Sequence, residues 1–111
     1  MGKKNLLTPA EMEIMEILWT AKQPMSSNDM LLSGKIEKWS SGYLHNVLRS
    51  MLKKDAIRVN GIVQSNTQYA RMFEPVLTRP EYAARMALSV GITEKELEEV
   101  AEALKRQMEE R

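Results

Sequence analysis

The hydrophobic pattern is clearest in residues 39–57, which predict a helix with two different faces. One face follows the i, i+3, i+4 spacing of a buried stripe and consists of Leu44, Val47, Leu48, Met51 and Leu52. The other face is polar or cationic and holds no carboxylate before Asp55; it carries Gly42, Tyr43, His45, Asn46, Arg49, Ser50 and Lys53. Such a face suits the major groove of DNA, because phosphates repel acidic side chains and base edges pair with donors and acceptors.

Two patterns predict helices upstream of this one. Thr8-Pro9-Ala10-Glu11 is a helix start, with a Thr cap, Pro at the first helical position and Glu at the third, and this helix is expected to run to about Lys22. Ser26-Ser27-Asn28-Asp29 caps a second, short helix that is expected to end near Ser33-Gly34. Helices in this order, followed by the polar-faced helix, predict a helix-turn-helix.

Residues 56–73 change to the alternating pattern of β-strands. The predicted strands are Ala56–Val59 and Gln68–Phe73, which form a hairpin, or wing, next to the helices. Between them, Asn60-Gly61 is either the turn itself or a bulge ahead of a longer tip, and the longer form is favoured because Gln64–Gln68 offers no apolar residue to bury. On these strands we expect Tyr69 and Phe73 on one face, with Arg58 and Arg71 exposed.

A helical tail is predicted after the strands. Arg79–Val90 has helical spacing, Gly91 ends it, and Thr93-Glu94-Lys95-Glu96 caps a final amphipathic helix. The apolar residues of the tail are expected to form a dimer contact through Tyr82, Met86, Leu97, Val100, Ala101, Leu104 and Met108. The final stripe either folds back on its own domain or meets a partner helix; its position beyond Gly91 and its acidic outer face favour a partner helix.

Length and charge divide the chain into two parts. A chain of 111 residues has room for one small domain plus an appendage, which we place at residues 1–75 and 76–111. The first part has a charge balance of +3 and the second of −2, which suits a DNA-binding head joined to an association tail. The expected fold is mainly α with a small β-hairpin: a winged helix-turn-helix with C-terminal dimerisation helices.

Composition argues against several other classes of protein. Without cysteine the chain has no disulfide or thiolate metal site. No apolar run approaches a membrane span and no signal-peptide core is present, so a cytoplasmic protein is expected. Phosphate-binding, nucleophile-elbow and metal-ligand spacings are absent, so we expect neither an enzyme nor a cofactor or metal. The nine methionines are interpreted as core gap fillers rather than Cu(I) ligands.

Three stretches resemble a known family, the penicillinase and methicillin-resistance repressors of the BlaI, MecI and CopY type. L-T-P-A-E-M-E-I-M-E-I-L-W at residues 7–19 is similar to the first-helix signature of that family. Residues 39–57 resemble its recognition helix and the start of its first wing strand. Q-Y-A-R-M-F-E-P-V-L-T-R-P-E-Y at residues 68–82 resembles its second wing strand and the start of its tail.

The resemblance implies a homodimer that binds an inverted-repeat operator in double-stranded DNA and represses transcription. The recognition helices would lie in major grooves, and the C-terminal helices would form the dimer contact. Carried onto this chain, base reading falls to Ser41, Gly42, Tyr43, Asn46 and Arg49, and phosphate contact to Ser40, Lys53 and Lys54. The DNA-binding set also includes His45 on the same helix and Asn66 at the wing tip.

The chain departs from the family pattern in the wing and in the tail. The wing tip reads Ser65-Asn66 where relatives usually carry a basic residue, which implies that wing contacts to phosphate are weaker or made by hydrogen bonds only. Gly91-Ile92 leaves no room for an extra tail helix, and the sequence has no Asn-Phe pair, the bond that relatives offer to a sensor-linked protease. Induction by cleavage at that bond is therefore not expected.

For several side chains the sequence leaves two interpretations open. Arg49 is a guanine reader or a solvated charge, and Lys53-Lys54 contact phosphates or form a solvated helix end. Tyr43 contacts DNA or packs on the wing, and His45, the single histidine, contacts DNA or is a plain surface residue. The rival function is a winged helix that only docks a protein partner, because the net charge is only +1. The sequence does not reveal the operator, the target genes or the inducer.

Overall fold

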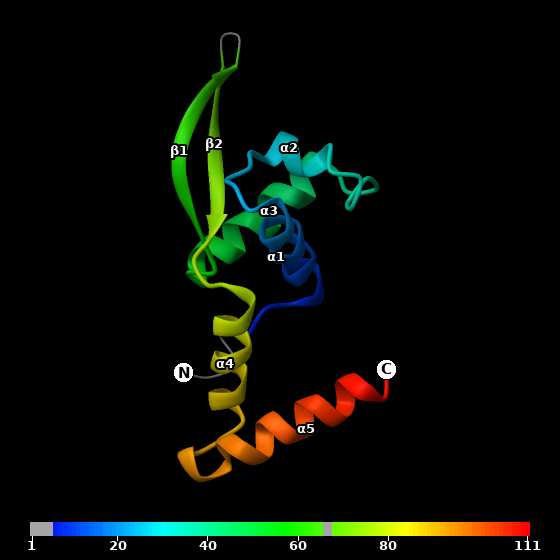
Figure 1. Cartoon of the computed structure of the whole chain (residues 1–111). Coiled ribbons are helices and arrows are strands. Elements are labelled where there is room, and N and C mark those ends of the chain that lie inside the picture. Colours follow the sequence, from blue (N-terminus) through cyan, green and yellow to red (C-terminus); the bar gives the residue numbers. More distant parts are fainter. Residues whose placement is uncertain (1–5, 66–67) are drawn as a thin grey trace.

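The computed structural model describes residues 6–65 and 68–111 of the chain. In order, it contains α1 (Pro9–Ala21), α2 (Ser27–Leu31), α3 (Ser41–Lys53), β1 (Ile57–Ser65), β2 (Gln68–Pro75), α4 (Arg79–Ser89), a 3₁₀ turn η2 (Glu94–Glu96) and α5 (Leu97–Glu109). Figure 1 shows α1, α2 and α3 beside the base of the hairpin, with α4 and α5 below them. The fold is a winged helix-turn-helix with a helical tail. Within the described ranges, no helix is long and apolar enough to cross a membrane.

Short-range capping explains where the helices begin. At α1 the Thr8 hydroxyl accepts the Glu11 N–H, and the Glu11 carboxylate accepts the Thr8 N–H. Ser26 and Asp29 exchange the same pair of bonds at the start of α2. The starts predicted from these two patterns are confirmed. A third capping box, formed by Thr78 with Glu81, begins α4.

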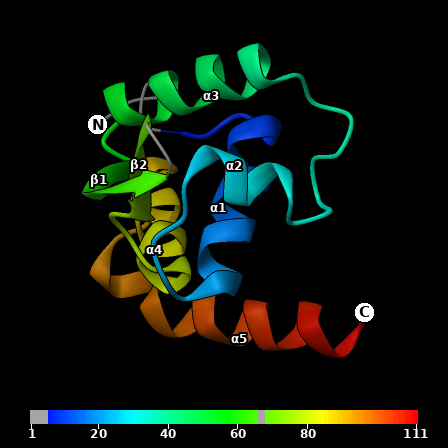
Figure 2. The same ribbon diagram turned by 90° about the horizontal axis from the view of Figure 1, so that it is seen from above.

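The hydrophobic core lies between α1, α2, α3 and the base of the hairpin. It consists of Ile14, Met15, Ile17, Leu18, Met30, Ile36, Leu44, Val47, Leu48, Met51, Ile57 and Phe73. The stripe predicted on α3 is confirmed, since its members from Leu44 to Met51 are buried while the opposite side of the helix is exposed. Figure 2 shows α3 along one edge of the molecule, with α1 and α2 between it and α5.

The hairpin is longer than the predicted strands and contains a bulge. β1 and β2 pair antiparallel, with Val59 opposite Phe73 and Ile62 opposite Arg71, so the register shifts at residues 60–61. Gly61 has a φ of 106°, which a glycine adopts without strain. The longer wing favoured from the sequence is therefore confirmed. Met25 adds two backbone hydrogen bonds to Phe73, of 2.9 and 2.7 Å, and so attaches the start of the α2 segment to the edge of β2.

Beyond its base the hairpin leaves the core. Phe73 is buried, whereas Tyr69, four residues earlier on β2, is 73% exposed. Ile62 and Val63 on β1 are exposed as well. The projecting half of the wing therefore contributes little to the core of this chain.

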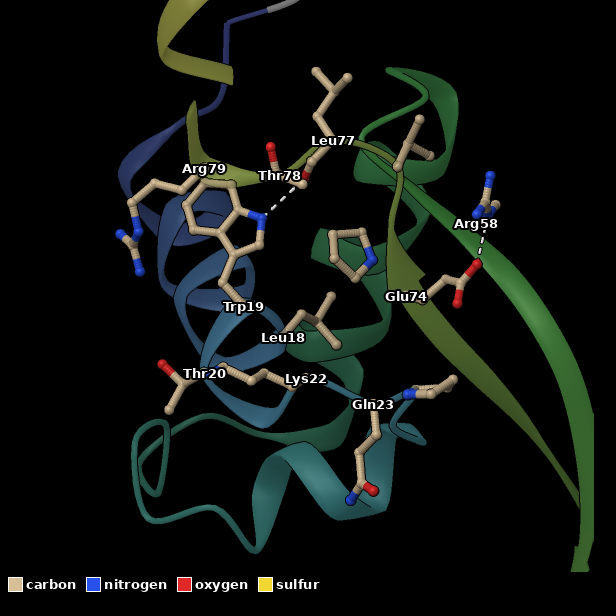
Figure 3. A pocket seen from close by; sticks show the side chains of 13 residues that line it. Leu18, Trp19, Thr20, Lys22, Gln23, Arg58, Glu74, Leu77, Thr78 and Arg79 are labelled. Atoms are coloured by element: carbon tan, nitrogen blue, oxygen red, sulfur yellow. Dashed lines mark hydrogen bonds and ion pairs between the residues drawn. The ribbon is translucent and has the colours of Figure 1, made fainter. Parts of the chain in front are cut away.

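The first turn of α4 is attached to α1. The Trp19 indole N–H donates to the Leu77 carbonyl (2.9 Å), and the Arg79 guanidinium lies 4.7 Å from the centre of the Trp19 ring while pairing with Glu16. Figure 3 shows Trp19, Leu77 and Arg79 beside an open cleft of about 820 Å³ between the end of α1 and residues 74–79. These contacts cross the boundary drawn at residue 75 and fix the start of the tail on the head.

The rest of the tail stands away from the head. The radius of gyration is 16.5 Å, compared with about 13 Å for a compact domain of this length. In Figure 1, α5 crosses below α4 and lies far from the core helices. No residue of α5 is buried in the single chain. The amphipathic helix that the sequence predicts is present, but its apolar face is not covered by its own head.

Candidate nucleic-acid interface

The start of α3 is fixed by a cap and an aromatic contact. The Ser40 hydroxyl accepts the Tyr43 N–H at 3.1 Å. The Trp39 ring meets the Tyr43 ring edge-on, with centroids 4.8 Å apart. Trp39 thus packs against the first turn of α3. Tyr43 packs on Trp39 and remains about half exposed.

The outer side of α3 forms one continuous polar surface. The predicted residues that are exposed on it are Ser41, Gly42, Tyr43, His45, Asn46, Arg49 and Lys53, with Ser40 at its start. In Figure 2 this helix forms the edge of the molecule opposite α5. The helix contains two cationic side chains and no acidic one, so its surface favours the approach of an anionic groove.

Two side-chain contacts organise this surface. Arg49 Nη1 donates to Asn46 Oδ1 at 3.3 Å, which leaves the Asn46 amide NH₂ as a donor. His45 Nδ1 lies 2.7 Å from the Ser41 carbonyl oxygen. Because a carbonyl only accepts, Nδ1 carries the proton, and in the neutral ring Nε2 is left as an acceptor. The helix therefore presents donors and an acceptor within about one turn.

Ser50, assigned to this face from the sequence, and Lys54, predicted as a phosphate contact, are engaged inside the chain. Ser50 is half-buried and donates to Glu11 Oε2 at 2.7 Å. Lys54 Nζ donates to Glu11 Oε1 at 2.6 Å and to the Leu6 carbonyl at 3.2 Å. Two of the three N–H donors of the Lys54 ammonium thus have partners within the fold, and its contact with phosphate stays a prediction.

Glu11 is the residue that sequence reasoning missed. The pattern assigned it only to the capping box of α1, and its box hydrogen bond to Thr8 is present. Glu11 also accepts hydrogen bonds from Ser50 and Lys54, which lie 39 and 43 positions away in the sequence. No local pattern signals such a contact.

The wing contributes a second polar surface. Arg58 pairs with Glu74 across the strands at 2.6 Å, and Asn60 Nδ2 donates to the same carboxylate at 2.7 Å. These hydrogen bonds, that of Arg58 first, hold the pKa of the Glu74 carboxyl below its ordinary value. Both predicted arginines of the wing are exposed, but Arg58 is tied to Glu74, whereas Arg71 lies opposite Ile62. Asn66, the predicted contact at the tip, lies outside the described residues.

The predicted dimer contacts of the tail divide into two groups. Tyr82 is only 7% exposed and packs within its own chain, so we remove it from the dimer contact. On α5, Leu97, Leu104 and Met108 are 61, 51 and 59% exposed. Met86 and Ala101 are exposed and Val100 is half-buried.

The comparison with protein families shows to which family the chain belongs. The model of the penicillinase repressor family matches residues 7–110, from the first helix to the end of α5. The chain belongs to the penicillinase repressor family. A member of this family is a DNA-binding transcriptional regulator of the repressor type, so the resemblance seen in the sequence is confirmed.

Comparisons with individual proteins support no further conclusion about this chain. Among solved structures, the adhesin competence repressor AdcR of Streptococcus pyogenes is similar to this penicillinase repressor homologue, with 20% sequence identity and a TM-score of 0.47. The alignment covers 94% of this chain and 80% of that one. No curated protein sequence matches the chain.

Proposed function

We propose that the chain represses transcription as a homodimer that binds an inverted-repeat operator. In this proposal residues 1–75 form the DNA-binding head and residues 76–111 form the dimerisation tail. The observation that supports it best is the combination of an exposed, carboxylate-free α3 surface with an apolar α5 face that the chain itself leaves uncovered.

The α3 surface supports a division of labour on DNA. In this proposal Asn46, Arg49 and Tyr43, which are exposed on α3, would contact base edges, and Arg is the side chain that most often pairs with guanine through two hydrogen bonds. Ser41, Gly42 and His45 would complete the surface that faces the groove, while Ser40 and Lys53 would contact phosphates. Phosphate contacts set the position of the head, and base contacts discriminate between sequences.

The tail supports a twofold dimer. An isolated amphipathic helix of 13 residues is marginal in water unless its apolar face is covered. A second copy of α5 supplies a matching apolar stripe, and a twofold pair of identical stripes closes on itself. Two heads related by this axis would read half-sites in opposite directions, about one or two helical turns apart.

A binding selection from random DNA duplexes tests the proposal. The purified protein is incubated with the pool, bound duplexes are sequenced, and the enriched sequence is titrated at several salt concentrations. We expect an inverted repeat and an affinity that falls steeply with salt, because bound phosphates release counterions. Failure to enrich any sequence, together with weak binding at low salt, would contradict the proposal and favour a winged helix that docks a protein partner.

A further inference from the structure

A buried carboxylate lies beneath the recognition helix. Glu11 is only 2% exposed, although acidic side chains are almost never buried unless they are paired. Its Oε1 accepts hydrogen bonds from the Thr8 N–H (2.8 Å) and from Lys54 Nζ (2.6 Å). Its Oε2 accepts one from the Ser50 hydroxyl (2.7 Å). One carboxylate therefore joins the start of α1 to the C-terminal end of α3.

The charge state of Glu11 suits this role. Burial raises the pKa of the Glu11 carboxyl, but the hydrogen bonds from Lys54, Thr8 and Ser50 outweigh burial and hold the pKa below its ordinary value. The carboxylate is thus ionised at neutral pH. Lys54 is held on a second side by the Leu6 carbonyl, and its side chain is 22% exposed. Two of the three N–H donors of this ammonium group are therefore engaged within the chain.

The two anchor points on α3 restrict how the helix lies. Ser50 and Lys54 are four residues apart, so they are neighbours on one side of the helix. Contacts at both points restrict the rotation of α3 about its axis and its sliding along α1. Asn46 lies one turn before Ser50 on the same side, so rotation at Ser50 moves Asn46 directly.

We propose that Glu11 is a positioning residue for DNA recognition, which sets the rotation of α3 through Ser50 and Lys54 so that Asn46 and Arg49 meet base edges. Lys54 acts through Glu11 and not on a phosphate. This inference rests on the proposed function. Bidentate base contacts require donor and acceptor at hydrogen-bond distance, whereas non-specific binding depends mainly on charge. Loss of the Glu11 contacts therefore lowers affinity for the operator more than affinity for random duplex.

Two neighbouring lysines provide a matched comparison. Lys53→Met and Lys54→Met remove the same charge from adjacent positions, and each is titrated with the selected operator over a range of salt concentrations. For Lys53→Met we expect the slope of log affinity against log salt to become shallower by about 1 per subunit. For Lys54→Met we expect operator affinity to fall about tenfold or more with the slope unchanged. A slope that becomes shallower in both variants, or wild-type operator affinity in Lys54→Met, overturns the inference.

A double variant separates positioning from folding. In Glu11→Met/Lys54→Met the ion pair is replaced by two apolar side chains, a change that often preserves stability, whereas removal of one partner leaves a buried charge. Circular dichroism and solution mass establish that it is folded. We expect about a tenfold loss of operator affinity or more, with unchanged affinity for random duplex. If the double variant binds the operator as tightly as the wild type, the inference is overturned but the proposed function stands. If the wild-type protein itself shows no preference for an operator, both the proposed function and the inference are overturned.

Discussion

The hydroxyl of Tyr82 accepts a hydrogen bond from the backbone N–H of Leu7 at 2.9 Å, although the two residues are 75 positions apart. The same ring lies 6.4 Å from Trp19, so the start of α4 is packed on both ends of the α1 segment. The orientation of the tail is therefore tied to the head. In a dimer joined through α5, this junction helps to set the separation of the two recognition helices.

Tyr82→Phe should lower the free energy of unfolding by about 1 kcal/mol, because it leaves the Leu7 N–H without its partner while the ring stays packed. Urea denaturation measures the loss, at one fixed protein concentration, since dimerisation makes stability depend on concentration. Tyr69→Phe is the matched control, because the Tyr69 side chain is exposed on the wing. Removal of its hydroxyl should change the free energy of unfolding by less than about 0.5 kcal/mol. Equal losses in the two variants would show that the Tyr82 hydroxyl has no special role.

Acid should destabilise the fold. The pKa of Glu11 is held below 4.5, its ordinary value, as are those of Glu16, Glu74 and Glu81. A carboxyl with a lower pKa in the folded state stabilises the protein above its unfolded pKa, and this contribution is lost as the pH falls through the folded pKa. The free energy of unfolding should therefore decrease below about pH 4.5, as followed by urea midpoints from neutral pH to about pH 3.

Glu11→Gln tests how much of this acid response comes from the buried carboxylate. The variant should be less stable than the wild type at neutral pH, because Lys54 loses its charged partner. The difference between the two proteins should narrow in acid, where the wild-type carboxyl is protonated as well. A difference that stays constant with pH would mean that Glu11 is not ionised in the folded protein.

Arg49→Ala should weaken binding to the selected operator by about 1–3 kcal/mol and relax base preference at one position. The reason is that Arg49 is exposed on the face of α3 that carries Asn46, which accepts its hydrogen bond. Competition titrations with operator and with random duplex measure both affinities. If the two affinities fell by the same factor, Arg49 would be a phosphate contact and not a base reader.

Leu97→Asp/Leu104→Asp should yield a monomer where the proposed function expects a dimer, and should remove the affinity gained by linking two half-sites. Both side chains belong to the exposed apolar face of α5, and a carboxylate there would be buried without a partner. Light scattering after size exclusion gives the mass. Arg106→Asp is the control, because it places a carboxylate on the same helix away from the apolar face. A dimer mass in the double variant would show that the dimer contact lies elsewhere.

The sequence predicted those features that depend on neighbouring residues. The boxes at Thr8 and Ser26 identify helix starts, because each hydrogen bond spans three residues. The two faces of α3 follow from helical spacing alone, and the structure buries and exposes them as expected. The choice between a turn and a bulge at Asn60-Gly61 needed the register of the paired strands, although the polar tip pointed to the longer form.

The tertiary structure decided the contacts of residues whose partners are distant in the chain. The sequence by itself determined the helix-turn-helix, the wing and the amphipathic tail, because periodicity and capping are local. Only the fold showed that Lys54 pairs with Glu11 and that Tyr82 is bound to Leu7. Helical spacing states which side of a helix a residue occupies, but not which other element covers that side. That choice is made by the packing of whole elements, and there a buried charge is stable only beside its partner.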